Sequence, residues 1–410
     1  MRKENLARFV FPKTAAAHFA ARDHRNRLCP LEKHHRSCNT RGRIPRAGYR
    51  HRSLRDGWLK SSPVTTSTPA CRRRQRVADA ADGTTIPRVY HCHTGQNFTE
   101  NGKPEFVPDG YSVDFEASRV EEFMNARQGR NEPFFLYYNI SPPHCPVAGA
   151  PEKYLTMYRP ADLPIRPNAD LSHVLENQET HFKVYRWDFR YYLLGLPHTL
   201  ELPENYGIPQ LYAEYYGTVT WMDEAVGRML TALDRTGLAK NTIVVFISDH
   251  GDNLGSHGYV QKGGPNEESI RIPFITRWPE GLPHGRVIRK QVASLIDVYP
   301  SLLGLIDAPA PRHVHGRNLA PVMDGQADSL SEDFAIIETS KGITIRTPSH
   351  MYFIESSGDN HALANEPSFL FDVNNDLYQL KNLATLTKTE LFRSLDDRIR
   401  RWNARIPWMD

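Results

Sequence analysis

The chain has 410 residues, a formal net charge of +4, and 40% hydrophobic and 24% charged residues. This composition is typical of a globular protein, and the length suffices for one large or two ordinary domains with hydrophobic cores. No apolar run reaches the ~18 residues that a transmembrane helix needs, so we expect no membrane partner.

The charge is divided unevenly along the chain. Residues 1–90 contain 21 Lys and Arg against 6 Asp and Glu, whereas residues 91–410 contain 30 against 41. A basic segment of this kind suggests a nucleic-acid-binding or membrane-binding arm. Its apolar residues follow no helical or strand period, however, so its composition predicts disorder rather than a folded module. Its cysteines, Cys29, Cys38 and Cys71, form no C-x-x-C pair and predict no zinc site or disulfide framework.

A helix and a strand are predicted between residues 111 and 140. Tyr111–Gln128 carries apolar residues on one side, as a packed helix does. Pro133–Ile140 is a continuous apolar run, typical of a strand buried on both faces, and it leads into a loop that contains His144. Residues 160–205 are rich in Pro and aromatic residues, which indicates an inserted surface segment.

A second helix and strand follow this insertion. Ala213–Thr236 has apolar residues at helical spacing, and Asn241–Ile247 is a buried strand that ends at Asp249-His250. Alternation of helices and buried strands predicts an open α/β sheet, in which ligands bind beyond the carboxyl ends of the strands. His144 and Asp249-His250 both follow such strand ends and are therefore candidate site residues.

The C-terminal part has a different pattern. A helix is predicted over Ile296–Ile306, and Leu391–Trp402 forms an amphipathic closing helix. Between them lie short strand-like runs separated by polar turns: Phe334–Glu338, Gly342–Arg346, Met351–Ile354 and Ser368–Asp372. These runs predict a small, largely antiparallel sheet.

The predicted fold class is therefore α/β, with an open, mixed, mostly parallel sheet flanked by helices and a small C-terminal antiparallel sheet plus helix. Three parts are expected along the chain. Residues 1–90 form a basic segment that is disordered or not native to the fold, residues 91–325 form an α/β domain, and residues 326–410 form an α+β subdomain.

The polar residues at the strand ends suggest metal and anion chemistry. Asp249 and His250 could place an oxygen and a nitrogen on one divalent metal ion; alternatively, Asp249 caps the next helix and His250 is exposed. Lys262 lies in the glycine-rich loop 255–264 and could neutralise a tetrahedral oxyanion; alternatively, it is a solvated loop lysine.

In their order along the chain, these motifs closely resemble the sulfatase family, the arylsulfatase-like branch of the alkaline phosphatase superfamily. The resemblance covers roughly residues 100–405 and rests on Phe134–Leu136, Pro143-His144, Val244–Asp252, Leu254–Gly258, Lys262-Gly263, Glu267–Pro273, Gln291–Leu302 and Phe369–Val373.

The resemblance implies a role for each matched residue. Asp249 and His250 would be two ligands of one divalent cation, calcium in this family, and Lys262 would contact the substrate sulfate. His144 would bind the sulfate or protonate the leaving oxygen, unless it is merely a loop histidine packed by its neighbouring prolines. His257, in the adjoining loop, is a further candidate for substrate binding. The implied partner is a sulfated small molecule or sulfated glycan, not nucleic acid.

Two features of the family pattern are absent. Sulfatases use a formylglycine nucleophile made from a C/S-x-P/A-x-R motif, and no Cys or Ser in the sequence fits that motif. The early Asp-Asp pair of metal ligands is also missing, because the only Asp-Asp, Asp396-Asp397, lies in the closing helix and is interpreted as solvated. We therefore expect an N-terminally incomplete sulfuric ester hydrolase. Because this sequence contains no candidate nucleophile, we expect the chain to be inactive.

Several explanations of this gap stay open. In the first, the gene is read from a wrong start; in the second, the chain is a pseudoenzyme that binds sulfated ligands; in the third, another polypeptide completes it. Two further alternatives are a different hydrolase of the same superfamily and a non-catalytic protein that binds polyanions or nucleic acid through residues 1–90. The sequence shows no signal peptide, although a periplasmic or extracellular location would suit the family. The specific ester, the localisation and the oligomeric state are left open.

Overall fold

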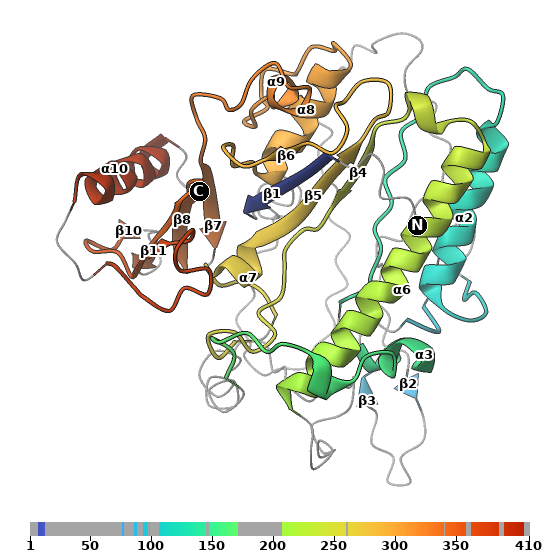
Figure 1. Ribbon diagram of the computed structural model, residues 1–410, viewed down its shortest axis with the longest axis horizontal. Helices are drawn as coiled ribbons and strands as arrows, with labels where there is room; N and C mark the ends of the chain where they lie inside the picture. Colours follow the sequence, from blue (N-terminus) through green and yellow to red (C-terminus); the bar gives the residue numbers. More distant parts are fainter. Residues whose placement is uncertain are drawn as a thin grey trace, which may run out of the picture.

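The computed structural model describes most of the chain after residue 93 (Figure 1). The described residues are 93–96, 98, 106–144, 147–170, 207–259, 261–339, 341–357, 362–384 and 389–405, together with the backbone of three strands at 7–12, 76–77 and 86–87. The rest of the basic segment 1–90, and the predicted insertion beyond residue 170, lie outside these ranges. The alternative of polyanion binding through residues 1–90 therefore stays a prediction.

Two long helices form one layer of the molecule (Figure 1). α2 (Ser112–Arg127) and α6 (Ile208–Arg235) both match predicted helices, although α6 begins five residues earlier than predicted. Pro209 lies in its first turn, where the missing N–H removes no helical hydrogen bond. The helices share an apolar core, and Arg228 Nε donates to Glu121 Oε1 across them at 2.8 Å.

The central sheet is mixed. Its strand order is β4-β5-β1-β6, formed by β4 (Val244–Ile247), β5 (Arg271–Arg277), β1 (Ala7–Pro12) and β6 (Val287–Ile288). β5 runs antiparallel to both of its neighbours, whereas β1 is parallel to β6. A mixed sheet with flanking helices confirms the predicted fold class, with more antiparallel pairing among the described strands than we expected. A separate two-stranded ladder pairs β2 (Arg76–Val77) with β3 (Ile86–Pro87).

Helices cover both faces of this sheet, because successive side chains of a strand point to opposite sides. Val244 packs on the layer of α2 and α6. On the opposite face, Val245 and Ile247 pack against α8 (Val298–Leu305) and α9 (Ala320–Met323). The 3₁₀ turns η4 (Ala239–Asn241) and η5 (Leu295–Asp297) lead into β4 and α8.

The segment 133–140 differs from its prediction as a strand buried on both faces. It is extended but pairs with no strand among the described residues. Phe134, Leu136 and Tyr138 pack against the core of α2 and α6, whereas Phe135 and Tyr137 are 73% and 66% exposed. Burial on the second face requires a layer of the protein packed on that face, and the apolar run by itself could not show whether one is there.

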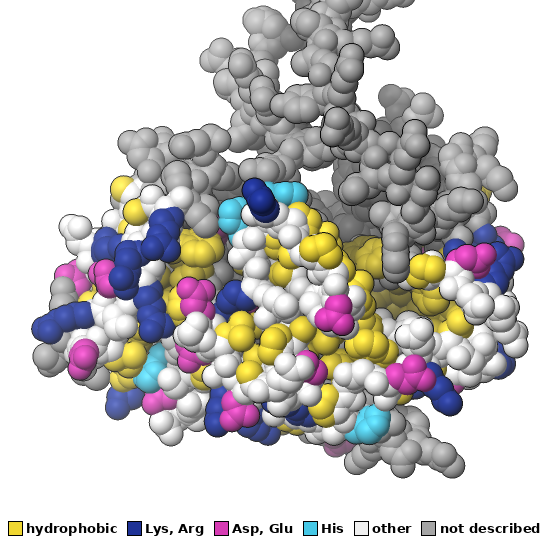
Figure 2. All heavy atoms as spheres, turned by 90° about the horizontal axis from the view of Figure 1, so that it is seen from above, with side chains coloured by type: hydrophobic (Ala, Val, Ile, Leu, Met, Phe, Trp, Pro, Cys, Tyr) yellow, Lys and Arg dark blue, Asp and Glu magenta, His cyan; other side chains and the backbone are white. Residues whose placement is uncertain are grey.

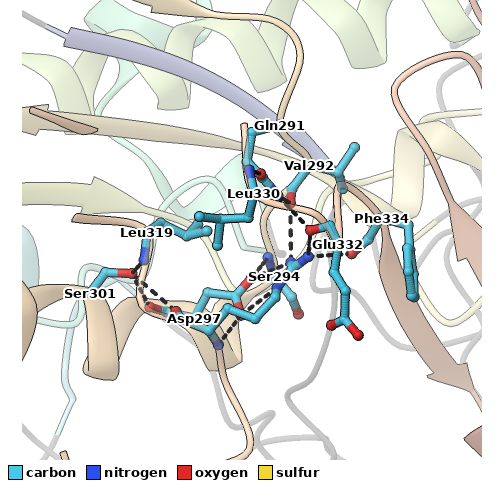
Figure 3. A network of polar contacts seen from close by, with 10 residues as sticks. Gln291, Val292, Ser294, Asp297, Ser301, Leu319, Leu330, Glu332 and Phe334 are labelled. Atoms are coloured by element: carbon cyan, nitrogen blue, oxygen red, sulfur yellow. Dashed lines mark hydrogen bonds and ion pairs between the residues drawn. The ribbon is translucent and has the colours of Figure 1, made fainter. Parts of the chain in front are cut away.

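Asp297 ties α8 to the chain on either side of it (Figure 3). Its carboxylate is 1% exposed and accepts hydrogen bonds from Ser294 N at 2.8 Å and from Arg317 Nη2 at 2.7 Å. Arg317 Nη2 also donates to the Val292 carbonyl at 3.1 Å. The buried charge is thus fully compensated by an arginine and by backbone N–H groups.

The C-terminal residues form the predicted antiparallel sheet and closing helix. The sheet has the order β10-β9-β8-β7 with β11 paired to β9; its strands are β7 (Ala335–Thr339), β8 (Gly342–Arg346), β9 (His350–Ser357), β10 (Ala362–Leu363) and β11 (Phe369–Asp372). α10 (Glu390–Arg405) packs on it through Phe392 and Leu395. Asp396 accepts a hydrogen bond from Tyr352 at 2.8 Å, so only Asp397 of this pair is on the solvated face, contrary to our prediction.

Three short helices follow the 133–140 segment, namely η1 (Val147–Gly149), α3 (Glu152–Leu155) and η2 (Pro160–Asp162). Seen from above, the molecule exposes hydrophobic side chains over the middle of its face, and Lys and Arg side chains gather at the end on the side of α10 (Figure 2).

Within the described ranges, no helix has the length and apolar character needed to span a membrane.

Candidate active site

A cavity of about 330 Å³ opens where the segment 133–140 and β4 end. Its walls include four of the five predicted site residues, His144, Asp249, His250 and Lys262. The prediction that loops after these two segments meet at one place therefore agrees with the structure, although the roles of the residues stay predictions. Glu116 and Tyr215, which the sequence did not indicate, also line the cavity.

Lys262 and His144 form the closest polar contact across this cavity among its predicted residues. Lys262 Nζ lies 3.3 Å from His144 Nε2. An ammonium group can only donate, so His144 Nε2 accepts in this contact and the imidazole is neutral. Lys262 is exposed and His144 is partly buried, so an anion entering the cavity can reach both side chains.

The loop that carries Lys262 is closed at its base by Ser269 of α7 (Glu267–Ile270). The Ser269 carbonyl accepts the Gly251 N–H at 3.1 Å, and its hydroxyl accepts the Gly263 N–H at 3.1 Å. Gly263 has φ +100°, a conformation that side chains disfavour, directly after Lys262. One buried serine therefore fixes both ends of the loop and with them the position of Lys262.

Asp252 closes the same loop from within. One of its carboxylate oxygens, Oδ1, accepts the backbone N–H groups of Leu254 and Gln261, each at 3.0 Å. This places the residue before Lys262 directly beside the residue after Gly251. The sequence placed Asp252 in a family motif but gave it no role.

Asp249 and His250 follow β4 and are arranged as a pair of metal-type ligands. His250 Nδ1 lies 2.8 Å from the Gly251 carbonyl, so Nδ1 carries the proton, and Nε2 lies 3.2 Å from Asp249 Oδ2. A carboxylate oxygen and an imidazole nitrogen so close together fit one divalent cation when Nε2 carries no proton. They are two ligands, whereas calcium takes about six to eight oxygens.

No larger metal group is formed within the described ranges, where no three His, Cys, Asp or Glu residues are placed to hold an ion together. The assignment of Asp249 and His250 as ligands of one divalent ion, with calcium as the ion, therefore stays a prediction.

His257, the fifth predicted residue, is not among the residues that line the cavity. Its Nε2 lies 3.0 Å from Asn168 Nδ2 and 3.5 Å from Glu268 Oε2. Burial would raise the pKa of Glu268, but hydrogen bonds with His257 and Asn168 outweigh it and lower that pKa. These contacts anchor the outer turn of the Lys262 loop, and a part in substrate binding stays a prediction.

Buried Glu116 and partly buried Tyr215 also line the cavity, and the pKa of each is shifted. Burial raises the pKa of Glu116 to about 7, partly offset by the nearby Tyr138 hydroxyl. Burial, with a smaller effect from Asp252, also raises the pKa of Tyr215, which therefore keeps its proton. A sequence signal for Glu116 existed, since it is an acidic residue on the helix face that also carries Val113 and Val120.

Comparisons with known proteins show which family the chain resembles. The family model described as Sulfatase matches residues 58–308. The multifunctional alkaline phosphatase superfamily protein PehA of Trinickia caryophylli is 34% identical over 54% of this chain and 43% of its own length. An ulvan-active sulfatase of Formosa agariphila is 28% identical over 72% of this chain and 52% of its own length.

A solved structure shares the fold. The putative sulfatase yidJ from Bacteroides fragilis superposes with a TM-score of 0.59 at 23% identity, covering 77% of this chain and 64% of that one. This chain spans about half the length of the curated relatives it matches. Because the family model matches more than half of its residues, the chain belongs to the sulfatase family, within the alkaline phosphatase superfamily.

Proposed function

We propose that the cavity binds the sulfate group of a sulfate ester, and that the family activity this chain derives from is sulfuric ester hydrolysis. The observation that carries the proposal is the 3.3 Å contact between Lys262 Nζ and His144 Nε2 beside the Asp249–His250 pair. A cation and a neutral imidazole facing one cavity suit a tetrahedral oxyanion.

Each residue has a distinct part in this proposal. Lys262 donates charge-assisted hydrogen bonds to sulfate oxygens, and its position is set by Ser269 and Asp252. His144 donates to the sulfate from Nε2 once it is protonated, and in that state it can pass the proton to the leaving alcohol oxygen. Tyr215, which keeps its proton, is a neutral donor on the same wall.

Asp249 and His250 would hold a divalent cation, with calcium as our choice. Such an ion, when bound, polarises a sulfate oxygen as a Lewis acid. The chain's own contribution is to keep an oxygen and a nitrogen 3.2 Å apart, with the imidazole proton fixed on Nδ1 by the Gly251 carbonyl.

Turnover needs a nucleophile that these residues do not supply. The sequence holds no C/S-x-P/A-x-R motif from which formylglycine could be made. We therefore propose that the chain as written binds sulfated glycans or sulfated small molecules and does not hydrolyse them. Since PehA is named multifunctional, a phosphate ester is the competing oxyanion to test.

The experiment combines binding with turnover. Calorimetric titration with inorganic sulfate should show saturable binding, at least about tenfold weaker in Lys262→Met, because a hydrogen bond to a charged group is worth about 1.5–3 kcal/mol. Lys240→Met, at an exposed lysine outside the cavity, is the matched control. 4-Nitrophenyl sulfate and 4-nitrophenyl phosphate, with and without calcium, should give no turnover.

Three results would overturn the proposal. Equal sulfate affinity of the wild type and Lys262→Met contradicts the binding site. Sulfate-ester turnover above that of a heat-denatured sample contradicts the absence of a nucleophile, and preference for phosphate over sulfate contradicts the assignment of the oxyanion.

A further inference from the structure

Glu116 is a buried carboxyl in the cavity wall that the proposed mechanism does not use. It lies on α2, is 6% exposed, and lines the same cavity as Lys262 and His144. Its neighbours along the helix face, Val113 and Ala117, are fully buried in the apolar core. A carboxyl in such surroundings is costly to ionise without a partner.

One oxygen of the Glu116 carboxyl is left without a donor. The Tyr138 hydroxyl lowers the pKa of Glu116 as a hydrogen-bond donor does, but Glu116 Oε2 has no partner at hydrogen-bonding geometry among the described residues. An unsatisfied buried acceptor costs about 1–3 kcal/mol, and such groups in native proteins call for an explanation.

The other acidic residues of α2 show that this is a local exception. Asp114 and Glu121 both lie by Arg228, at 3.7 Å and 2.8 Å, and Glu122 pairs with Arg119. Glu116 alone of these four acids lacks an arginine partner in the described part of the chain, and it alone lines the cavity. The Glu116 carboxyl, which lacks a hydrogen-bond donor at Oε2, thus belongs to the wall of the cavity in which a ligand would bind.

We propose that Glu116 determines substrate specificity by accepting a hydrogen bond from a hydroxyl or ammonium group on the alcohol part of the sulfate ester. This inference rests on the proposed function, because it assumes that Lys262 and His144 hold the sulfate. Sugar sulfates, which carry such donors, are therefore the substrate class, and aryl sulfates, whose rings carry none, are poor ligands.

The test is calorimetric binding at pH 7.5 with four probes: inorganic sulfate, methyl sulfate, glucose 6-sulfate and glucosamine 6-sulfate. Glu116→Ala should weaken glucose 6-sulfate binding about tenfold or more and leave inorganic sulfate and methyl sulfate unchanged. Glu116→Gln keeps a neutral acceptor oxygen, so it should preserve binding of the hydroxyl sugar. Glu122→Gln, at the exposed acid on the same helix, should behave as the wild type for all four probes.

The two sugars separate the two kinds of donor. If the ligand group is an ammonium, glucosamine 6-sulfate binds the wild type more tightly than glucose 6-sulfate, and Glu116→Gln abolishes that difference. If it is a hydroxyl, the two sugars bind alike and Glu116→Gln binds both as the wild type does. Either pattern supports the proposal, with the source of the donor identified.

The failures are distinguishable. If Glu116→Ala weakens the binding of inorganic sulfate and of the sugars equally, or weakens neither, the role of Glu116 is overturned. The proposed sulfate site then still stands, provided that the wild type binds sulfate. Absence of sulfate binding to the wild type overturns the proposed function. Even then, the melting temperature of ligand-free Glu116→Gln at pH 8 tests whether the carboxylate is unsatisfied. We expect this melting temperature to be at least that of the wild type. A lower value would show that the carboxylate has a partner within the protein.

Discussion

Lys262 and His144 are 118 positions apart in the sequence, yet Lys262 Nζ lies 3.3 Å from His144 Nε2. The contact arises because the loop after the 133–140 segment and the loop after β4 open into one cavity. Neither residue is buried enough to need the other for stability, so the contact is best understood as the rim of an anion site.

Ser269→Ala should loosen the Lys262 loop. It leaves the Gly263 N–H without its acceptor, and a lost hydrogen bond of this kind costs about 1 kcal/mol. We expect a matching decrease in the free energy of unfolding and severalfold weaker sulfate binding. Chemical denaturation and calorimetry measure the two effects. Ser394→Ala, at an exposed serine of α10, is the control; equal behaviour of both variants would contradict the positioning role.

The buried ion pair between α7 and β8 should be a main determinant of stability. Arg346 Nε donates to Glu267 Oε1 at 2.7 Å, and both side chains are almost completely buried. Removing one partner, as in Arg346→Met, leaves a buried charge and should cost about 3–5 kcal/mol. Lys290→Met, at an exposed pair with Asp328, should leave the denaturation midpoint unchanged. A small effect of Arg346→Met would mean that the subdomains do not depend on this contact.

The exposed face of the 133–140 segment gives a paired test. Phe135 is 73% exposed, so Phe135→Ser should change the free energy of unfolding by less than about 0.5 kcal/mol. Leu136 packs in the core of α2 and α6, so Leu136→Ala should cost about 2 kcal/mol. Urea denaturation of both variants distinguishes this arrangement from a strand buried on both faces, for which the two costs would be similar.

The pKa of Glu116 predicts a pH dependence of stability. Burial raises its pKa from 4.5 to about 7 in the folded protein, so between these values the native state binds more protons than the unfolded state. The contribution of Glu116 to the free energy of unfolding is fully present below pH ~4.5 and is lost as the pH rises through 7; the total loss is about 3 kcal/mol. Glu116→Gln should remove this part of the pH profile in denaturation measurements from pH 5 to 8. Parallel profiles for the two proteins would show that Glu116 does not titrate in this range.

The sequence predicted elements with strong periodicity more reliably than it predicted their partners. α2 and α6 follow from apolar spacing, because their pattern fixes which side is buried. Whether the face of the strand-like segment that carries Phe135 is covered depends on residues distant in the chain, which no local pattern records. The cavity residues His144 and Lys262 could be predicted since they follow extended segments or glycine turns. Glu116 could not be assigned, because a helix pattern does not show that its apolar face also borders a cavity.

The central claim, that sulfate binds between Lys262 and His144, is tested most directly by nuclear magnetic resonance of the His144 imidazole during a sulfate titration. The resonance is assigned by its loss in His144→Gln. We predict a saturable shift of the His144 signals in the wild type and in Lys240→Met, strongly weakened in Lys262→Met. Unchanged His144 signals at saturating sulfate, or the same titration curve in Lys262→Met as in the wild type, would contradict the account.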